Sequence, residues 1–310
     1  MIVIKTGQTK RHQEVPLSFI EDNFEFSRRK NIPPSRPKRR ARFISMALDG
    51  VMVVLVVMIA YEAIKLGRYY FDLQQNSRAA EKAQDIYFAA MEQGQENALE
   101  AESFPTENTP QATLAVTEAP VSKREVFIRQ LQEDFSNPDI FAYLVVEGTA
   151  ISYPVAHGTD NDFYINHDLY GRPNVAGAVF MDMGNATGMD DPNTIFYGHN
   201  MKNGSMFHNL RFYEDYDYFQ EHRYIQVVTA QEDMDWEIFA FYATDTSFPY
   251  IRTDFYSPDD FYSLAMQMKE RSFYDTGVDI TKEDIILTLS TCTNRAEDSR
   301  YVINARLMVK

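Results

Sequence analysis

The segment TLSTC (residues 288–292) carries the only cysteine in the 310-residue chain. This segment overlaps the end of the apolar run IILTL (residues 285–289), and such a run is typical of a buried strand. A single cysteine cannot form a disulfide within the chain, so two interpretations remain. The thiol is either a small buried apolar group or a nucleophile that needs a histidine from elsewhere. Strand alternation places Thr288, Ser290 and Cys292 on the more polar face, as expected for a site.

Short apolar segments separated by turn residues extend on both sides of this run. Eight of them match the length and pattern of strands: residues 140–146, 151–155, 177–181, 194–197, 224–228, 236–244, 285–292 and 301–309. This number of short strands indicates a mainly β fold, either a barrel or a sandwich. Ser257, followed by Pro258 and acidic residues, predicts a helix over residues 257–270. A second helical segment is expected near residues 204–213.

An apolar segment near the N-terminus is long enough to cross a membrane. Residues 51–60, VMVVLVVMIA, contain no polar side chain, and the whole segment 44–64 reaches the length of a transmembrane helix. The preceding stretch RRKNIPPSRPKRRAR (residues 28–42) carries eight Lys and Arg residues. By the positive-inside rule, the N-terminus is cytoplasmic and the rest of the chain lies outside the cell. A retained anchor is favoured over a cleaved signal peptide, because the basic tail is long and no small-residue cleavage site follows. It is favoured over a buried core helix, because the segment is apolar all round and has a basic flank.

The charge of the chain is distributed unevenly. Residues 1–43 hold 11 basic and 4 acidic side chains, whereas the remainder holds 19 basic and 41 acidic ones. An acidic body argues against nucleic-acid binding, which relies on clustered Lys and Arg. A basic head on an acidic body is instead consistent with a membrane whose two sides meet different parts of the chain.

These patterns divide the chain into four parts. We expect a basic cytoplasmic tail (1–43), a transmembrane signal-anchor (44–64), a helical and then Thr/Pro/Glu-rich stalk (65–123) and a folded domain (124–310). The domain is expected to begin with an amphipathic helix over Arg124–Phe135. Its candidate core positions are Val126, Phe127, Ile128, Leu131 and Phe135.

His199 is the histidine whose position best suits a partner for the thiol. It follows the expected strand 194–197 and Gly198, which permits a sharp turn, and catalytic groups are commonly presented on such loops. His12 falls in the cytoplasmic tail, and surface or structural roles are expected for His157, His167, His208 and His222. No H-x-x-x-H or H-E-x-x-H pair is present, and a single cysteine offers little sulfur, so a zinc site is not expected.

Arg300 is a candidate third member of the site. It lies eight residues beyond Cys292, at the start of the last expected strand. If the two strands are antiparallel neighbours, their connection returns Arg300 to the level of Cys292. A guanidinium there could stabilise an oxyanion or hold a substrate carbonyl. The alternatives are a surface ion pair with Glu297 or Asp298, and Arg295 as a weaker candidate for the same role.

Together these motifs resemble the sortases, and class B sortases in particular. The resemblance rests on TLSTC, on the arginine that opens the last strand, on NTIFYGHNMKNGSMF (193–207) and on ISYPVAHGTDNDFYINHDLYGRPNVAGAVFMD (151–182). It covers residues 124–310 and includes the helix before the cysteine strand. The resemblance implies a closed eight-stranded β-barrel with flanking helices behind a transmembrane helix.

The resemblance also implies a catalytic mechanism and its residues. Cys292 would attack the Thr carbonyl of an N-P-x-T-x sorting motif in a surface protein, and His199 would protonate the leaving amine. Arg300 would stabilise the transition state or orient the substrate. An amine of the peptidoglycan cross-bridge would then resolve the thioacyl-enzyme, and this chemistry requires neither a metal nor an organic cofactor. Matching positions imply that Asn161, Ile165 and Ser290 line the groove for the sorting signal.

Three other functions are compatible with the same residues. A pilin-polymerising sortase would differ only in using a lysine as the resolving amine. In a cysteine protease, water would resolve the thioacyl-enzyme. A degenerate binding module would keep the groove without the chemistry. The distance between His199 and Cys292 separates the last of these from the enzymes.

Overall fold

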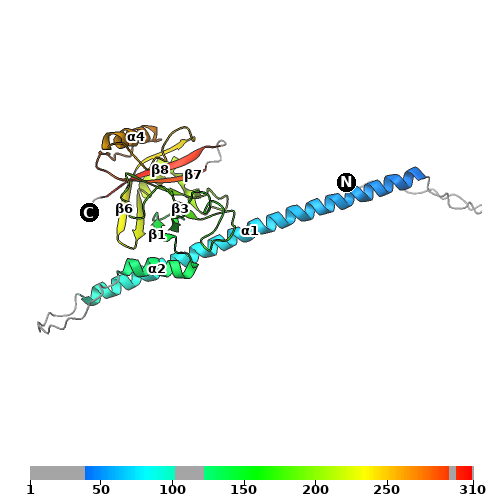
Figure 1. Ribbon diagram of the computed structural model, residues 1–310, viewed down its shortest axis with the longest axis horizontal. Helices are drawn as coiled ribbons and strands as arrows, with labels where there is room; N and C mark the ends of the chain where they lie inside the picture. Colours follow the sequence, from blue (N-terminus) through cyan, green and yellow to red (C-terminus); the bar gives the residue numbers. More distant parts are fainter. Residues whose placement is uncertain (1–38, 102–121, 293–297, 309–310) are drawn as a thin grey trace, which may run out of the picture. The chain divides into compact units, whose positions relative to one another are not determined.

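The computed structural model describes residues 39–101, 122–292 and 298–308 (Figure 1), with side chains over 43–92, 122–291 and 298–308. The chain divides into two compact units, residues 1–61 and 62–310. The first helix, α1 (Arg39–Ala101), runs through the boundary between them. The two units are therefore described in turn.

The first unit contains the apolar part of α1. Among the described residues, the helix from Phe43 is the one that is long and apolar enough to cross a membrane, with a mean hydropathy of 2.5 over its best window. Its apolar side chains are exposed on all sides, including Val51, Leu55 and Ile59. A helix that is apolar all round suits a lipid environment rather than the surface of a domain. The segment is thus a candidate single-pass anchor.

The second unit begins with the rest of α1, which packs against the folded domain. Leu73, Ala79, Ala83 and Ile86 are buried along one face of the helix. Polar contacts supplement them: Lys82 pairs with Asp134 at 2.8 Å, and the Tyr87 hydroxyl donates to Gln226 Oε1 at 2.9 Å. The sequence predicted a stalk over 65–123; the helix extends to Ala101, and residues 102–121 lie outside the described residues.

Eight strands close into a barrel, which confirms the mainly β fold and excludes the sandwich. The strands are β1 (Ile140–Val145), β2 (Ser152–Ala156), β3 (Val179–Met181), β4 (Asn193–Tyr197), β5 (Tyr224–Thr229), β6 (Asp233–Thr244), β7 (Ile286–Cys292) and β8 (Arg300–Leu307). Their order around the barrel is β1-β2-β3-β4-β7-β8-β6-β5. The pairs β2–β3 and β4–β7 are parallel, and the other neighbours are antiparallel. All eight predicted strands are present, and β6 begins three residues earlier than expected.

Four helical segments accompany the barrel: α2 (Lys123–Phe135), the 3-10 helix η1 (Phe207–Glu214), α3 (Tyr216–Glu221) and α4 (Pro258–Arg271). The predicted helix start at Ser257 is confirmed, because its hydroxyl accepts a hydrogen bond from the Asp260 amide at 3.2 Å. In α2 one predicted core position is wrong: Val126 is 51% exposed. Phe127, Leu131 and their neighbours occupy the buried face, and the helical rotation of 100° per residue carries Val126 away from it.

The apolar side chains form layers on both sides of the barrel wall. One cluster fills the interior and includes Phe196, Leu287, Leu289 and Ile303. A second lies between the outer face of β6, β7 and β8 and the helix α4, and includes Ile286. A third joins α1 and α2 to the barrel beside β1. In Figure 1, α4 and α2 lie on different sides of the barrel.

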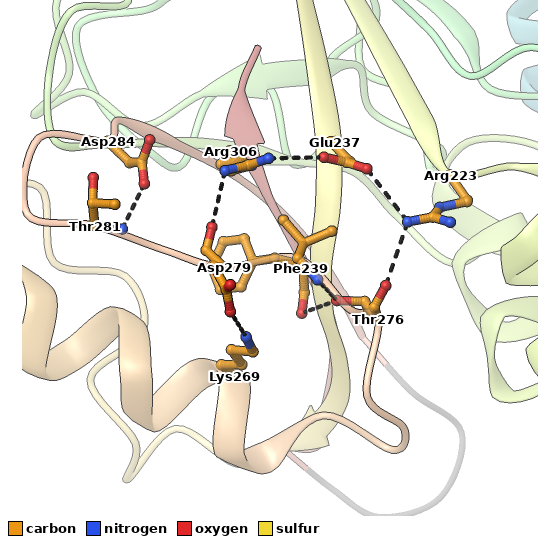
Figure 2. Close-up of polar contacts among 10 residues, drawn as sticks. Arg223, Glu237, Phe239, Lys269, Thr276, Asp279, Thr281, Asp284 and Arg306 are labelled. Carbon is orange, nitrogen blue, oxygen red and sulfur yellow. Dashed lines mark hydrogen bonds and ion pairs between the residues drawn. The ribbon is translucent and has the colours of Figure 1, made fainter. Parts of the chain in front are cut away.

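A charged network holds the connection between α4 and β7. Figure 2 shows Glu237 of β6 between two arginines, Arg306 of β8 at 3.1 Å and Arg223 at 3.3 Å. Arg306 also donates to the Asp279 carbonyl at 3.0 Å, and Arg223 donates to the Thr276 carbonyl at 3.4 Å. The carboxylate thereby fixes two guanidinium groups, and each of them donates a hydrogen bond to the backbone that leads into the TLSTC strand.

Glu237→Gln is expected to lower the free energy of unfolding by about 1–3 kcal/mol, because it leaves two partly buried guanidinium groups without their carboxylate. Asp279→Asn is the control. It removes an ion pair with Lys269 whose carboxylate is 96% exposed, and such pairs contribute about 0–1 kcal/mol. Urea denaturation of the full chain in detergent measures both changes. Equal losses in the two variants would contradict a special role for Glu237.

Candidate active site

Two parallel strands bring the predicted catalytic positions to one end of the barrel. β4 leads directly into Gly198 and His199, and β7 ends at Cys292. Their register pairs Tyr197 with Ser290, and the Gly198 amide donates to the Ser290 carbonyl at 3.2 Å. Because parallel neighbours end at the same edge of a sheet, the loop with His199 and the end of the TLSTC strand are adjacent. The side chain of Cys292 lies outside the described residues.

The predicted return of Arg300 to the level of Cys292 is confirmed. β7 and β8 are antiparallel, and their register pairs these two residues directly. Arg300 is half-buried and donates to the Ser299 carbonyl at 3.1 Å. Within the described part of the chain it forms no ion pair with Asp298, while Arg295 and Glu297 fall outside that part.

A groove of about 460 Å³ opens at this end of the barrel. It is lined by Asn161, Asp162, Ile165, Ala178, Phe180, Tyr197, Gly198, His199, Thr246, Tyr250, Ile251, Ser290, Thr291 and Arg300. The structure thus brings together five of the six predicted site residues. The sixth, Cys292, directly follows the lining residue Thr291.

His199 is oriented by the backbone of the segment that carries Ile165. Its Nε2 lies 2.6 Å from the Ile165 carbonyl oxygen. A carbonyl can only accept, so Nε2 carries the hydrogen in this arrangement. Nδ1 has no hydrogen-bond partner among the described residues. Gly198 allows close packing before His199, because a Cβ at this position would lie 2.8 Å from the Phe207 ring.

Asn161 takes part in a hydrogen-bonded cluster below the groove. Its Nδ2 donates to Asp182 Oδ2 at 2.9 Å, and its Oδ1 accepts from the Met183 amide at 2.8 Å. The Tyr197 hydroxyl donates to the same Asp182 oxygen at 2.8 Å. Burial, followed by the charge of Asp182, raises the pKa of Tyr197 far above its ordinary value, so the phenol stays protonated as a donor.

Sequence reasoning missed two parts of the groove. One part is Tyr197, the last residue of β4, whose hydrogen-bond partner Asp182 directly follows β3. A position at the end of a strand is a weak signal for function. The other part is the connection between β6 and α4, which supplies Thr246, Tyr250 and Ile251. The Tyr250 hydroxyl is 2.9 Å from Ser290 Oγ, and Ile251 is 48% exposed. The stretch SFPYIR (247–252) has no periodicity that would have indicated a wall of a site.

The remaining histidines of the described chain do not line the groove. Nδ1 of His167, His208 and His222 lies within hydrogen-bond distance of Phe163 O, Asn200 Oδ1 and Glu147 O, respectively. Burial, followed by the nearby Arg211, lowers the pKa of His208. Over the residues described, no cluster of three or more His, Cys, Asp or Glu side chains could hold a metal ion.

The closed barrel, with a histidine loop, a cysteine strand and an arginine meeting at one groove, is the architecture of a sortase-type enzyme. Comparison with known proteins gives the same answer. The family model described as the sortase domain matches residues 144–308. The chain therefore belongs to the sortase family.

The relatives found by comparison are class B sortases. Sortase B of Listeria monocytogenes is 38% identical over 185 residues, which cover 59% of this chain and 74% of the relative. Sortase B of Staphylococcus aureus is 28% identical over 274 residues, 87% of this chain and 98% of the relative. The crystal structure of sortase B from B. anthracis in complex with AAEK1 superimposes with a TM-score of 0.61, at 32% identity, covering 78% of this chain and all of that one. The chain is thus an enzyme of the class B sortase kind, a cysteine transpeptidase.

Proposed function

We propose that this enzyme cleaves a short sorting motif of the N-P-x-T-x type in surface proteins and transfers the acyl part to an amine of the peptidoglycan cross-bridge. The observation that carries the proposal is the meeting of His199, Arg300 and the end of the TLSTC strand at one groove. At about 460 Å³ the groove is the size of a small-ligand site. It suits a few residues of an extended peptide rather than a folded protein.

The chemistry assigns one role to each of three residues. The thiolate of Cys292 attacks the Thr carbonyl carbon, and the guanidinium of Arg300 stabilises the negative oxygen of the tetrahedral intermediate. Nδ1 of His199 delivers a proton to the departing amine as the carbon–nitrogen bond breaks. The incoming amine then attacks the thioester, returns a proton to His199 and releases the thiolate. Nε2 of His199 can remain bonded to the Ile165 carbonyl throughout.

The groove offers both apolar and polar contacts to the peptide. Ile165, Phe180 and Ile251 supply apolar surface, while Asn161 and Ser290 supply hydrogen-bonding groups. The internal bonds of Asn161 leave it one Nδ2 hydrogen for a ligand. This combination favours recognition of a motif with both an apolar and an amide-bearing side chain.

The proposed topology places the reaction outside the cell. The basic residues before the apolar helix favour a cytoplasmic N-terminus, with residues 62–310 on the opposite side. Surface proteins that carry a C-terminal sorting signal and cell-wall amines are both available there. We further propose the division into tail (1–43), anchor (44–64), stalk (65–123) and catalytic domain (124–310).

Incubation of the full chain in detergent with an N-P-x-T-x peptide library, with and without amines, tests the proposal. Intact mass spectrometry should show an acyl adduct on Cys292 that an added cross-bridge peptide removes. Faster removal of the adduct by a pilin-type lysine than by the cross-bridge peptide would favour a pilin-polymerising sortase. Removal by water as fast as by any added amine would favour a cysteine protease. If no peptide formed an adduct although the thiol alkylated readily, a degenerate binding module would be favoured.

A further inference from the structure

The connection between β6 and α4 (residues 245–257), called the loop below, forms one wall of the groove. A single asparagine holds its backbone. Both hydrogens of the Asn193 side-chain amide are used on this loop: Nδ2 donates to the Tyr250 carbonyl at 3.1 Å and to the Arg252 carbonyl at 2.8 Å. These two carbonyls flank Ile251, whose side chain lines the groove. Asn193 therefore fixes the backbone on either side of a groove residue.

The Asn193 side chain is in turn bonded to β7, and through β7 it is linked to β8. Thr288 of β7 donates its hydroxyl hydrogen to Asn193 Oδ1 at 2.7 Å, and Asn304 of β8 donates from Nδ2 to the Thr288 hydroxyl at 2.8 Å. We call these three residues the buried relay. The order of donors is determined, because Asn193 has no hydrogen left for Thr288 and Thr288 must therefore supply one. The relay thus has one self-consistent arrangement.

The buried relay is separate from the groove. All three side chains are completely buried, and none of them lines the groove. They alternate along their strands with interior residues such as Leu287 and Ile303, so they face outward, under the loop and α4. Polar groups in such a place are costly when they are left without a hydrogen bond, and Asn304 Oδ1 already has no partner among the described residues. The loss of a further bond therefore disturbs the other members.

A second link joins the same loop to the same strand. Ser290, two residues beyond Thr288, is in hydrogen-bond contact with the Tyr250 hydroxyl at 2.9 Å. The β7 strand that ends at Cys292 therefore contacts both the side chain and, through the relay, the backbone of the loop. The position of the wall is set relative to the strand that carries the predicted nucleophile.

We propose that the buried relay is a set of positioning residues, Asn193, Thr288 and Asn304. It holds Tyr250 and Ile251 in place in the wall of the groove and thereby determines affinity for the peptide. The proposal rests on the proposed function, because it takes the groove to be the site of the sorting peptide. It predicts that damage to the relay acts on peptide binding rather than on the reactivity of the thiol.

Thr288→Val tests the proposal, and Thr194→Val is the matched control. Thr194 is equally buried, on the adjacent strand β4, but its hydroxyl has no hydrogen-bond partner among the described residues. Thr288→Val removes both hydrogen bonds of this buried hydroxyl and is expected to raise the KM for an N-P-x-T-x peptide about tenfold, with little change in kcat. Thr288→Ser should restore the KM, and Thr194→Val should leave it unchanged.

Two further measurements separate positioning from damage to the fold or the chemistry. The alkylation rate of Cys292 by iodoacetamide should be the same in all variants. Hydrogen exchange of residues 246–253 should be faster in Thr288→Val than in Thr194→Val. If Thr288→Val does not fold, Asn304→Ala should raise the KM and the loop exchange in the same direction, by a smaller factor.

The outcomes distinguish the relay from the proposed function. Equal KM values and equal loop exchange for Thr288→Val and Thr194→Val would overturn the role of the relay while peptide turnover by the wild type still supported the function. A wild-type chain that reacts with no peptide would overturn the function and the claim about affinity. In that case hydrogen exchange would still decide whether the relay holds the loop.

Discussion

Replacement of Cys292 by alanine is expected to abolish acyl-enzyme formation, with no peptide adduct detectable by intact mass and no transfer to an added amine. The thioester needs a sulfur atom, and the chain has no other cysteine. The fold should survive, because the substitution removes one atom at the end of β7 and leaves the backbone pairing with Arg300 unchanged. A variant that still transfers peptide to an amine would refute the assignment of the nucleophile.

His199→Ala extends this test, because it removes the group proposed to transfer the proton and keeps the nucleophile Cys292. General acid–base groups typically contribute about 10²–10⁴ in rate, so acylation should be slowed by about that factor. His167→Ala is the matched control, because that imidazole also contacts a backbone carbonyl, at 2.9 Å, but does not line the groove. Equal activity losses in the two variants would show that His199 acts only through the structure.

Gly177→Ala is expected to cause the largest loss of stability among single-methyl additions to this domain. Gly177 has φ = 58°, and a Cβ there would lie 2.4 Å from the Tyr164 carbonyl oxygen and 2.6 Å from that of Ile165. The left-handed backbone costs about 1–2 kcal/mol for a residue with a side chain. The contacts with rigid backbone atoms add to this, so the total should exceed about 3 kcal/mol.

The same substitution should also reduce activity, since the Ile165 carbonyl is the hydrogen-bond partner of His199. Gly171→Ala separates the two causes. Its φ of 70° is similar, but the nearest atom to its Cβ would be 4.0 Å away. This control should lose only about 1–2 kcal/mol and keep its turnover. Urea denaturation and peptide turnover measure both effects, and similar losses at the two glycines would contradict the argument from contacts.

Much of the barrel could be predicted from the sequence because its strands have a local signal. Apolar alternation and turn residues located all eight strands, and Ser257 located the start of α4. Val126 shows the limit of this signal at the edge of an apolar face, where a small rotation decides exposure. The closure of the barrel had no local signal and followed from the resemblance to a family.

The groove could be predicted only in part, for a related reason. His199 and Cys292 each stand at the end of an apolar segment, so their position along a strand is informative. The wall that contains Ile251 depends on Asn193, which is 57 positions before Tyr250 and has no distinguishing neighbours. Likewise, the bond from Asn161 to Asp182 spans 21 positions. Contacts of this kind depend on the closed fold and cannot be read from a segment.

The parallel pairing of β4 with β7 has a consequence for the order of folding. Residues 198–285, with β5, β6 and α4, separate these two strands in the chain, and long closures of this kind are slow compared with local turns. In a chain that is still partly unfolded, the thiol and the imidazole would lie on segments that have not yet paired. Acyl transfer would then begin only after the last strands had docked, so enzymatic activity would report barrel closure.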